Sequence, residues 1–143
     1  MCSSDLPSEL KVAVISRMDL GKIYTGDLSE QDTVIEPIER NSLNNIEFVE
    51  GARLALDDFH RNHPNFPVHM MIVDSEGDTA QLTKDSWKSG LSKADVWITN
   101  ETGPTLSCLN RLSMKWEIPL VSCGINTADL IEDNPSAVAM LPS

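Results

Sequence analysis

The chain has 143 residues, of which 41% are apolar and 23% charged, a composition typical of one globular domain with its own core. Asp and Glu outnumber Lys and Arg by 22 to 11, which gives a net charge of −11 at pH 7. An acidic surface repels a phosphate backbone, so the composition argues against a nucleic-acid partner. The sequence contains no apolar run of the roughly 18 residues that a membrane-spanning helix needs.

Residues 1–9 are predicted to form an N-terminal tail, with no hydrophobic signal region before them. Cys2 is followed by small and acidic residues, as at the mature end of a bacterial lipoprotein, where that cysteine is acylated. The alternative is a stray cysteine in a disordered tail. If Cys2 carries the lipid, Cys108 and Cys123 are left either to pair with each other or to remain as two buried thiols. The cysteines and histidines show no spacing typical of a metal site, so no metal is expected.

Apolar segments and helical stripes alternate from residue 10 onward. Leu10–Ser16 is a short run rich in β-branched residues, which predicts a strand buried on both faces. Residues 17–41 have weak periodicity, with a short strand or helical turn expected near Thr33–Ile38, and loops of this length are usually functional or mobile. Ser42–Asn62 has the clearest helical pattern. Ser42 is its predicted cap, and its apolar stripe is Phe48, Val49, Ala52, Ala55, Leu56 and Phe59.

The second half of the chain continues this alternation. Further strands are predicted at Val68–Val73, Asp95–Thr99, Ile118–Ser122 and Ala137–Leu141. Asp78 or Thr79 would cap a helix over Thr79–Lys93. Gly103-Pro104 opens another helix, whose stripe is Leu106, Leu109, Leu112 and Trp116. Asn126 or Thr127 would cap a short helix that ends near Asp133.

The resulting order, β-α-β-α-β-α-β-α-β, predicts an α/β fold. Such alternation with short connections forms an open, mostly parallel sheet, here of about five strands, with helices on both faces. One domain over residues 10–143 is therefore expected.

Two turns within Ala94–Thr127 are predicted to form a binding site. Asn100–Thr105 and Ser122–Thr127 each follow the carboxyl end of an apolar strand, the edge where open α/β sheets hold ligands. Small hydroxyl residues and a helix start would offer free backbone N–H groups to a carboxylate or another small polar group. This pattern indicates binding and contains no catalytic group.

The motifs of the common enzymes with this fold are missing. Neither G-x-G-x-x-G nor G-x-x-x-x-G-K-[ST] occurs, and the G-x-S-x-G nucleophile turn is absent. A response-regulator receiver domain would carry acids after the first and third strands, where Ser16-Arg17 and Thr99-Asn100-Glu101 stand instead. The sequence therefore predicts no enzyme activity and no cofactor.

The order of several short segments resembles the type I periplasmic-binding-protein superfamily, which includes branched-chain amino-acid-binding proteins and receptor ligand-binding regions. Glu50–Asp58 (EGARLALDD) is similar to that family's first helix, G-x-x-L-A-[VL]-[DE]-[DE]. The other matching segments, in order, are Ile72–Ser75 with Gly77-Asp78, Gly103–Thr105, Trp116–Ser122 and Ala139–Ser143.

This resemblance implies an extracytoplasmic solute-binding protein with two lobes, of which residues 10–143 are part of the N-terminal one. In the family, the turns after strands three and four hold an amino acid. The corresponding ligand-binding residues here are Thr102, Gly103, Thr105, Ser122, Gly124 and Thr127. Glu101 departs from the family's small-residue pattern. It would oppose a carboxylate and favour a cationic group, unless it is a solvated turn residue.

The resemblance also implies partners and a location. The protein would lie in the periplasm or cell envelope, with a lipid anchor at Cys2, and would deliver its ligand to the membrane permease of an ABC transporter. One alternative is the ligand-sensing ectodomain of a signalling receptor, and a more distant one is a cytosolic flavodoxin-like enzyme or regulator. Because sheet edges would be left uncovered without the second lobe, this chain is expected to self-associate.

Overall fold

The computed structural model describes residues 9–20, 40–85, 90–124 and 127–140. Cys2, Thr33–Ile38 and Asn126, about which the sequence makes predictions, lie outside these ranges.

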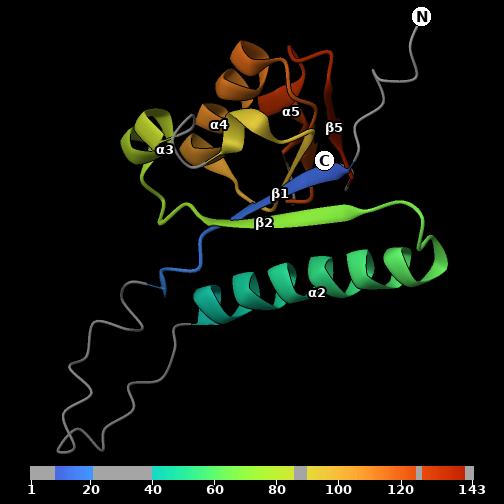
Figure 1. The fold of residues 1–143 in the computed structure, drawn as a ribbon. Helices are drawn as coiled ribbons and strands as arrows, with labels where there is room; N and C mark the ends of the chain where they lie inside the picture. The colour runs from blue at the N-terminus through green and yellow to red at the C-terminus, as the bar shows by residue number, and fades with distance from the viewer. Residues whose placement is uncertain (1–8, 21–39, 86–89, 125–126, 141–143) are drawn as a thin grey trace, which may run out of the picture.

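Five parallel strands form one sheet in the order β2-β1-β3-β4-β5 (Figure 1). The strands are β1 (Leu10–Ser16), β2 (Val68–Asp74), β3 (Val96–Thr99), β4 (Leu120–Ser122) and β5 (Ala137–Ala139). The chain adds β2 on one side of β1 and then returns to add β3 on the other. The strand order therefore reverses between β1 and β3, which is where open α/β sheets bind ligands. The predicted α/β fold with a parallel sheet is confirmed.

Helices cover both faces of this sheet because β1 is apolar on both sides. Val12 and Val14 pack with Val49 of α2 (Arg40–Asn62), whereas Ala13 and Ile15 point to the opposite face. That opposite face is covered by α3 (Thr79–Asp85), α4 (Gly103–Trp116) and α5 (Ala128–Ile131), as Figure 1 shows. The fully buried side chains on this face include Trp97, Leu106, Leu109 and Leu120. The apolar stripe predicted for α4 lies in this core, with Trp116 partly buried at its end.

The start and the stripe of α2 differ from the prediction. The helix begins at Arg40, so Ser42 is not its cap but a buried residue in the first turn. Ala55 and Phe59 lie outside the packed stripe: Ala55 is exposed, and Phe59 stacks on the ring of His63 with centroids 4.3 Å apart. Ile46 packs against the sheet instead, because its spacing from Val49 continues the buried face.

The helix predicted over Thr79–Lys93 is also shorter than expected. Its described part ends at Asp85, and Leu91–Lys93 form a separate 3-10 turn, η2. Gly90, which directly precedes η2, has φ +83, a left-handed conformation that one continuous right-handed helix over Thr79–Lys93 could not contain. The predicted cap at Asp78 is confirmed, since its Oδ1 accepts a hydrogen bond from the N–H of Gln81 at 3.0 Å.

Two further findings concern cysteines and membranes. Cys108 is a buried free thiol and Cys123 is a half-buried one, so the two are not bonded to each other. None of the helices in the described ranges is long and apolar enough to cross a membrane.

Candidate ligand-binding cleft

A polar cleft of about 560 Å³ opens at the point where the strand order reverses. Three segments line it: the turn after β1, the first turns of α2, and the turn that leads from β3 into α4. The lining residues are Arg17, Asp19, Ser42, Asn44, Asn45 and Asn100–Thr105. Hydroxyl, amide and charged groups dominate this set, which suits a small polar ligand.

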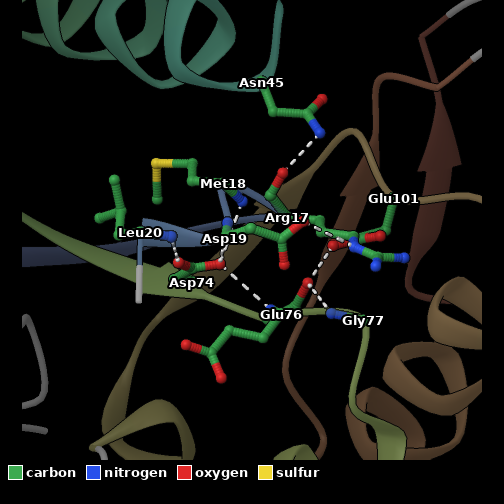
Figure 2. Close-up of polar contacts among 10 residues, drawn as sticks. Arg17, Met18, Asp19, Leu20, Asn45, Asp74, Glu76, Gly77 and Glu101 are labelled. Atoms are coloured by element: carbon green, nitrogen blue, oxygen red, sulfur yellow. Dashed lines mark hydrogen bonds and ion pairs between the residues drawn. The ribbon is translucent and has the colours of Figure 1, made fainter. Parts of the chain in front are cut away.

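The turn after β1 is built around the carboxylate of Asp74, at the end of β2 (Figure 2). Asp74 Oδ1 accepts the N–H groups of Met18 at 3.0 Å and Asp19 at 3.2 Å, and its Oδ2 accepts that of Leu20 at 2.8 Å. The N–H of Glu76 donates to the same carboxylate at 3.1 Å. This Asp74 cradle holds Asp19 at φ +53 and brings Arg17 and Asp19 to the cleft.

A chain of hydrogen bonds joins the three segments that line the cleft. Ser16 Oγ donates to Asn100 Oδ1 at 2.7 Å, and Asn100 Nδ2 donates to Asn45 Oδ1 at 2.8 Å. Asn45 Nδ2 in turn donates to the carbonyl oxygen of Arg17 at 2.6 Å. The cleft walls are therefore fixed relative to one another before any ligand arrives.

Glu101 is a buried member of the cleft wall, with only 7% of its surface exposed. The alternative that it is a solvated turn residue is therefore wrong. Ser75 Oγ donates a short hydrogen bond to Glu101 Oε1, and the N–H of Glu101 donates to Thr99 Oγ1 at 3.0 Å. Burial raises the pKa of the Glu101 carboxyl, and the hydrogen bond from Ser75 and the charge of Arg17 lower it in part.

The turn between β3 and α4 brings three predicted ligand residues to the cleft. Thr102 is exposed, Gly103 is half-buried and the side chain of Thr105 is buried, and all three line the cavity. Pro104 lies in the first turn of α4, as predicted, where its missing N–H costs no hydrogen bond. Gly103 has φ +57, so its lack of a side chain eases the start of the helix.

The turn after β4 packs against the turn between β3 and α4 and does not line the cleft. Ser122 and Thr127 are fully buried, their hydroxyl oxygens are 2.7 Å apart, and Thr127 Oγ1 donates to the carbonyl oxygen of Gly124 at 3.0 Å. A Cβ at Gly124 would lie 3.0 Å from the carbonyl oxygen of Glu101, so the two turns are in close contact. Thr127 precedes α5, but its hydroxyl makes no cap hydrogen bond. The roles of these three residues as ligand contacts remain predictions.

Sequence reasoning missed the part of the cleft formed by the turn after β1 and by α2. The missed residues are Arg17, Asp19, Ser42, Asn44 and Asn45. One available signal was the position of Ser16-Arg17 at the carboxyl end of the first strand. In a parallel sheet this end lies at the same edge as the carboxyl end of β3. Within the described ranges, no group of three or more His, Cys, Asp or Glu side chains gathers to hold a metal ion.

Comparison with known proteins identifies the fold. No protein-family model and no curated protein matches the sequence. The structure is similar to the branched-chain amino acid transporter substrate-binding protein LivJ from Streptococcus pneumoniae, solved in complex with isoleucine (TM-score 0.65, 13% identity, 92% of this chain and 33% of that one). The chain has the fold of a type I periplasmic-binding-protein lobe.

A second solved structure has a similar fold. The lobe is similar to a periplasmic binding protein from Burkholderia mallei, with a TM-score of 0.59 and 14% identity over 92% of this chain and 31% of that one. The lobe thus spans about a third of the length of each of these two proteins.

Proposed function

We propose that this chain is the ligand-binding lobe of an extracytoplasmic solute-binding protein that holds a small polar ligand, such as an amino acid, without catalysis. The observation that carries the proposal is the polar cleft at the reversal of strand order, in a lobe with the fold of substrate-binding proteins. A cleft at this place in the sheet is where an α/β lobe holds its ligand.

The proposal includes a second lobe that would close over the cleft. The walls described above surround the ligand from one side, and the chain spans 33% of LivJ. Hydroxyl and amide groups on fixed elements suit hydrogen bonds to a polar solute, because preorganised donors and acceptors lose little entropy on binding. Thr102, Gly103 and Thr105 would contact the ligand directly.

The proposal also covers location and partners. The protein would lie in the periplasm or cell envelope, held by a lipid on Cys2, and would pass its ligand to the membrane permease of an ABC transporter. A signalling partner in the membrane would replace the permease if the cleft serves a sensor. This proposal is supported by the fold shared with periplasmic substrate-binding proteins.

Isothermal titration calorimetry of the full-length protein with the common amino acids and small polar metabolites tests the proposal. Asn44→Ala removes an exposed amide from the cleft wall and should weaken binding about 5-fold, the worth of one hydrogen bond. Asn62→Ala is the matched control, because it removes the same exposed amide from the far end of α2. Absence of binding by every compound, or equal losses in both variants, would contradict the proposal.

A further inference from the structure

We propose that Glu101 is the counter-ion for a positively charged side-chain group of the ligand, so that the cleft selects solutes with a net positive charge over neutral zwitterions of the same shape. This inference rests on the proposed function and narrows its ligand class. It concerns one side chain in the cleft wall, at the turn after β3.

The Glu101 carboxyl has an incomplete set of hydrogen-bond partners. Its Oε1 accepts the hydroxyl of Ser75, whereas no hydrogen bond or ion pair from the described part of the chain reaches Oε2. Glu101 as a whole residue is 7% exposed, and among the described residues its Oε2 is not one of the fully buried polar atoms that lack a partner, so this oxygen keeps access to the cleft. Glu101 lines the cleft, so a ligand there can supply the missing donor.

The charges that line the cleft also favour a cationic ligand. Asp19 and Glu101 line it together with one cation, Arg17. Arg17 is already engaged, because its Nε donates to Asp19 Oδ2 at 3.2 Å. The guanidinium also lies against Gly77, where an added Cβ would stand 2.7 Å from Arg17 Nη1. When Glu101 is ionised, the cleft lining carries two negative charges and one positive charge. A cationic ligand would balance this excess negative charge.

Binding of a cation beside Glu101 should also release a proton from its carboxyl group. Burial raises the pKa of Glu101, so the carboxyl of the empty cleft keeps its proton to a higher pH than an exposed glutamate. A bound cation favours the ionised form. The Glu101 O–H bond then breaks, the proton passes to buffer, and the carboxylate pairs with the ligand. Binding of a cation should therefore release protons, whereas binding of a neutral analogue should not.

The experiment compares paired ligands on the full-length protein by calorimetry, in two buffers that differ in ionisation enthalpy. The probes are L-arginine with its neutral isostere L-citrulline, and L-lysine with L-norleucine. Wild type should bind the cationic member of at least one pair about 10-fold or more tightly, with proton release near the raised pKa of Glu101. Glu101→Gln keeps the shape and an acceptor for Ser75, and it should abolish both the preference and the proton release.

Glu47→Gln is the matched control, since it removes the same charge from an exposed site on α2, one turn from the cleft residue Asn44. It should leave the preference unchanged, and thermal unfolding should show that both variants are folded. Tight binding of neutral ligands alone, or an unchanged preference in Glu101→Gln, would overturn the counter-ion role while leaving the proposed function standing. Failure of every compound to bind would overturn both.

Discussion

Asp74 is the residue on which the turn after β1 depends. Its carboxylate accepts three consecutive N–H groups from Met18, Asp19 and Leu20 and a fourth from Glu76. No other side chain described in the structure replaces these contacts, and Asp19 is held at φ +53 by them. A single carboxylate therefore positions one whole wall of the cleft.

Asp74→Ala should lower the free energy of unfolding by about 2–3 kcal/mol, because four N–H donors lose a charged acceptor at once. Asp74→Asn should cost less, since its amide oxygen still accepts some of these bonds. Urea unfolding measures both. Asp57→Asn, at an exposed position of α2, should change stability by less than about 0.5 kcal/mol. A cost for Asp74→Ala no larger than that of the control would show that the cradle contributes nothing.

Two tryptophans of the same core differ in how their indole N–H groups are used. Trp97 is fully buried and its Nε1 donates to the carbonyl oxygen of Leu91 at 2.9 Å. Trp116 Nε1 is buried with no partner among the described residues. Trp97→Phe should cost about 2 kcal/mol through a lost hydrogen bond and a cavity. Trp116→Phe should cost under about 1 kcal/mol, because it removes an unsatisfied donor. Thermal unfolding that ranks them in the reverse order would contradict this account.

The buried carboxyl of Glu101 should make stability depend on pH. Below the pKa of the unfolded state, both states hold the proton and the group contributes nothing. As pH rises from there through the raised native pKa, the unfolded state loses its proton first, so the native state is progressively destabilised. Above the native pKa the penalty is constant. Urea unfolding between about pH 4 and 8 should show wild type losing stability relative to Glu101→Gln as pH rises. Parallel profiles would contradict this prediction.

At the scale of elements, the sequence was most informative where apolar periodicity decides the outcome. The strands around Leu10–Ser16 and Val68–Asp74 and the helix opened by Gly103-Pro104 were predicted closely, because both their patterns and their start signals are local. The boundaries at Ser42 and Gly90 were not. Ser42 has the chemistry of a cap, but the helix starts two residues earlier, and Gly90 adopts φ +83 within the range predicted as one continuous helix.

The candidate site was predicted only in part for the same reason. Thr102, Gly103 and Thr105 follow a strand and open a helix, so their place at the sheet edge can be inferred from their own segment. The contact from Asn45 to Arg17 spans 28 residues and that from Asp74 to Met18 spans 56. Such contacts depend on which segments pack together in three dimensions, and no local pattern encodes them.

The end of α4 offers a test of backbone strain. Glu117 follows the helix at φ +55, a left-handed conformation that costs most residues energy and glycine little. Its side chain is exposed, so Glu117→Gly should raise the free energy of unfolding by about 0.5–1 kcal/mol. Urea unfolding measures the gain. Glu132→Gly, at a right-handed position with φ −64, should be destabilising instead. A loss in Glu117→Gly as large as in Glu132→Gly would show that no strain is relieved.

For the whole molecule, the feature with the clearest consequence is the edge of the sheet at β5. Val138 is 56% exposed and Met140 is 62% exposed beside this edge. The longest helix, α2, packs over β1 and β2, at the other side of the sheet from β5. Parallel strands with one unpaired side and apolar side chains invite pairing with another chain. We therefore expect this chain to self-associate through β5.

Light scattering as a function of concentration tests this expectation. Val138→Lys should shift the chain towards monomer, because a charged side chain at an edge strand opposes pairing. Leu54→Lys is the matched control, since Leu54 is 61% exposed on α2, away from the sheet edge. A clean monomer for the unmodified chain at high concentration, or equal effects of both substitutions, would contradict association through β5.

The Asp74 cradle also has a consequence for the order of folding. The N–H groups of residues 18–20 find their acceptor only at the end of β2, more than 50 residues later in the chain, so these three backbone donors have no local partner. They should therefore remain unprotected until β1 and β2 have paired. Pulsed hydrogen exchange during refolding should show these three amides becoming protected together with those of β2. The wall that faces the ligand would then be a product of long-range pairing, completed only when the sheet itself is complete.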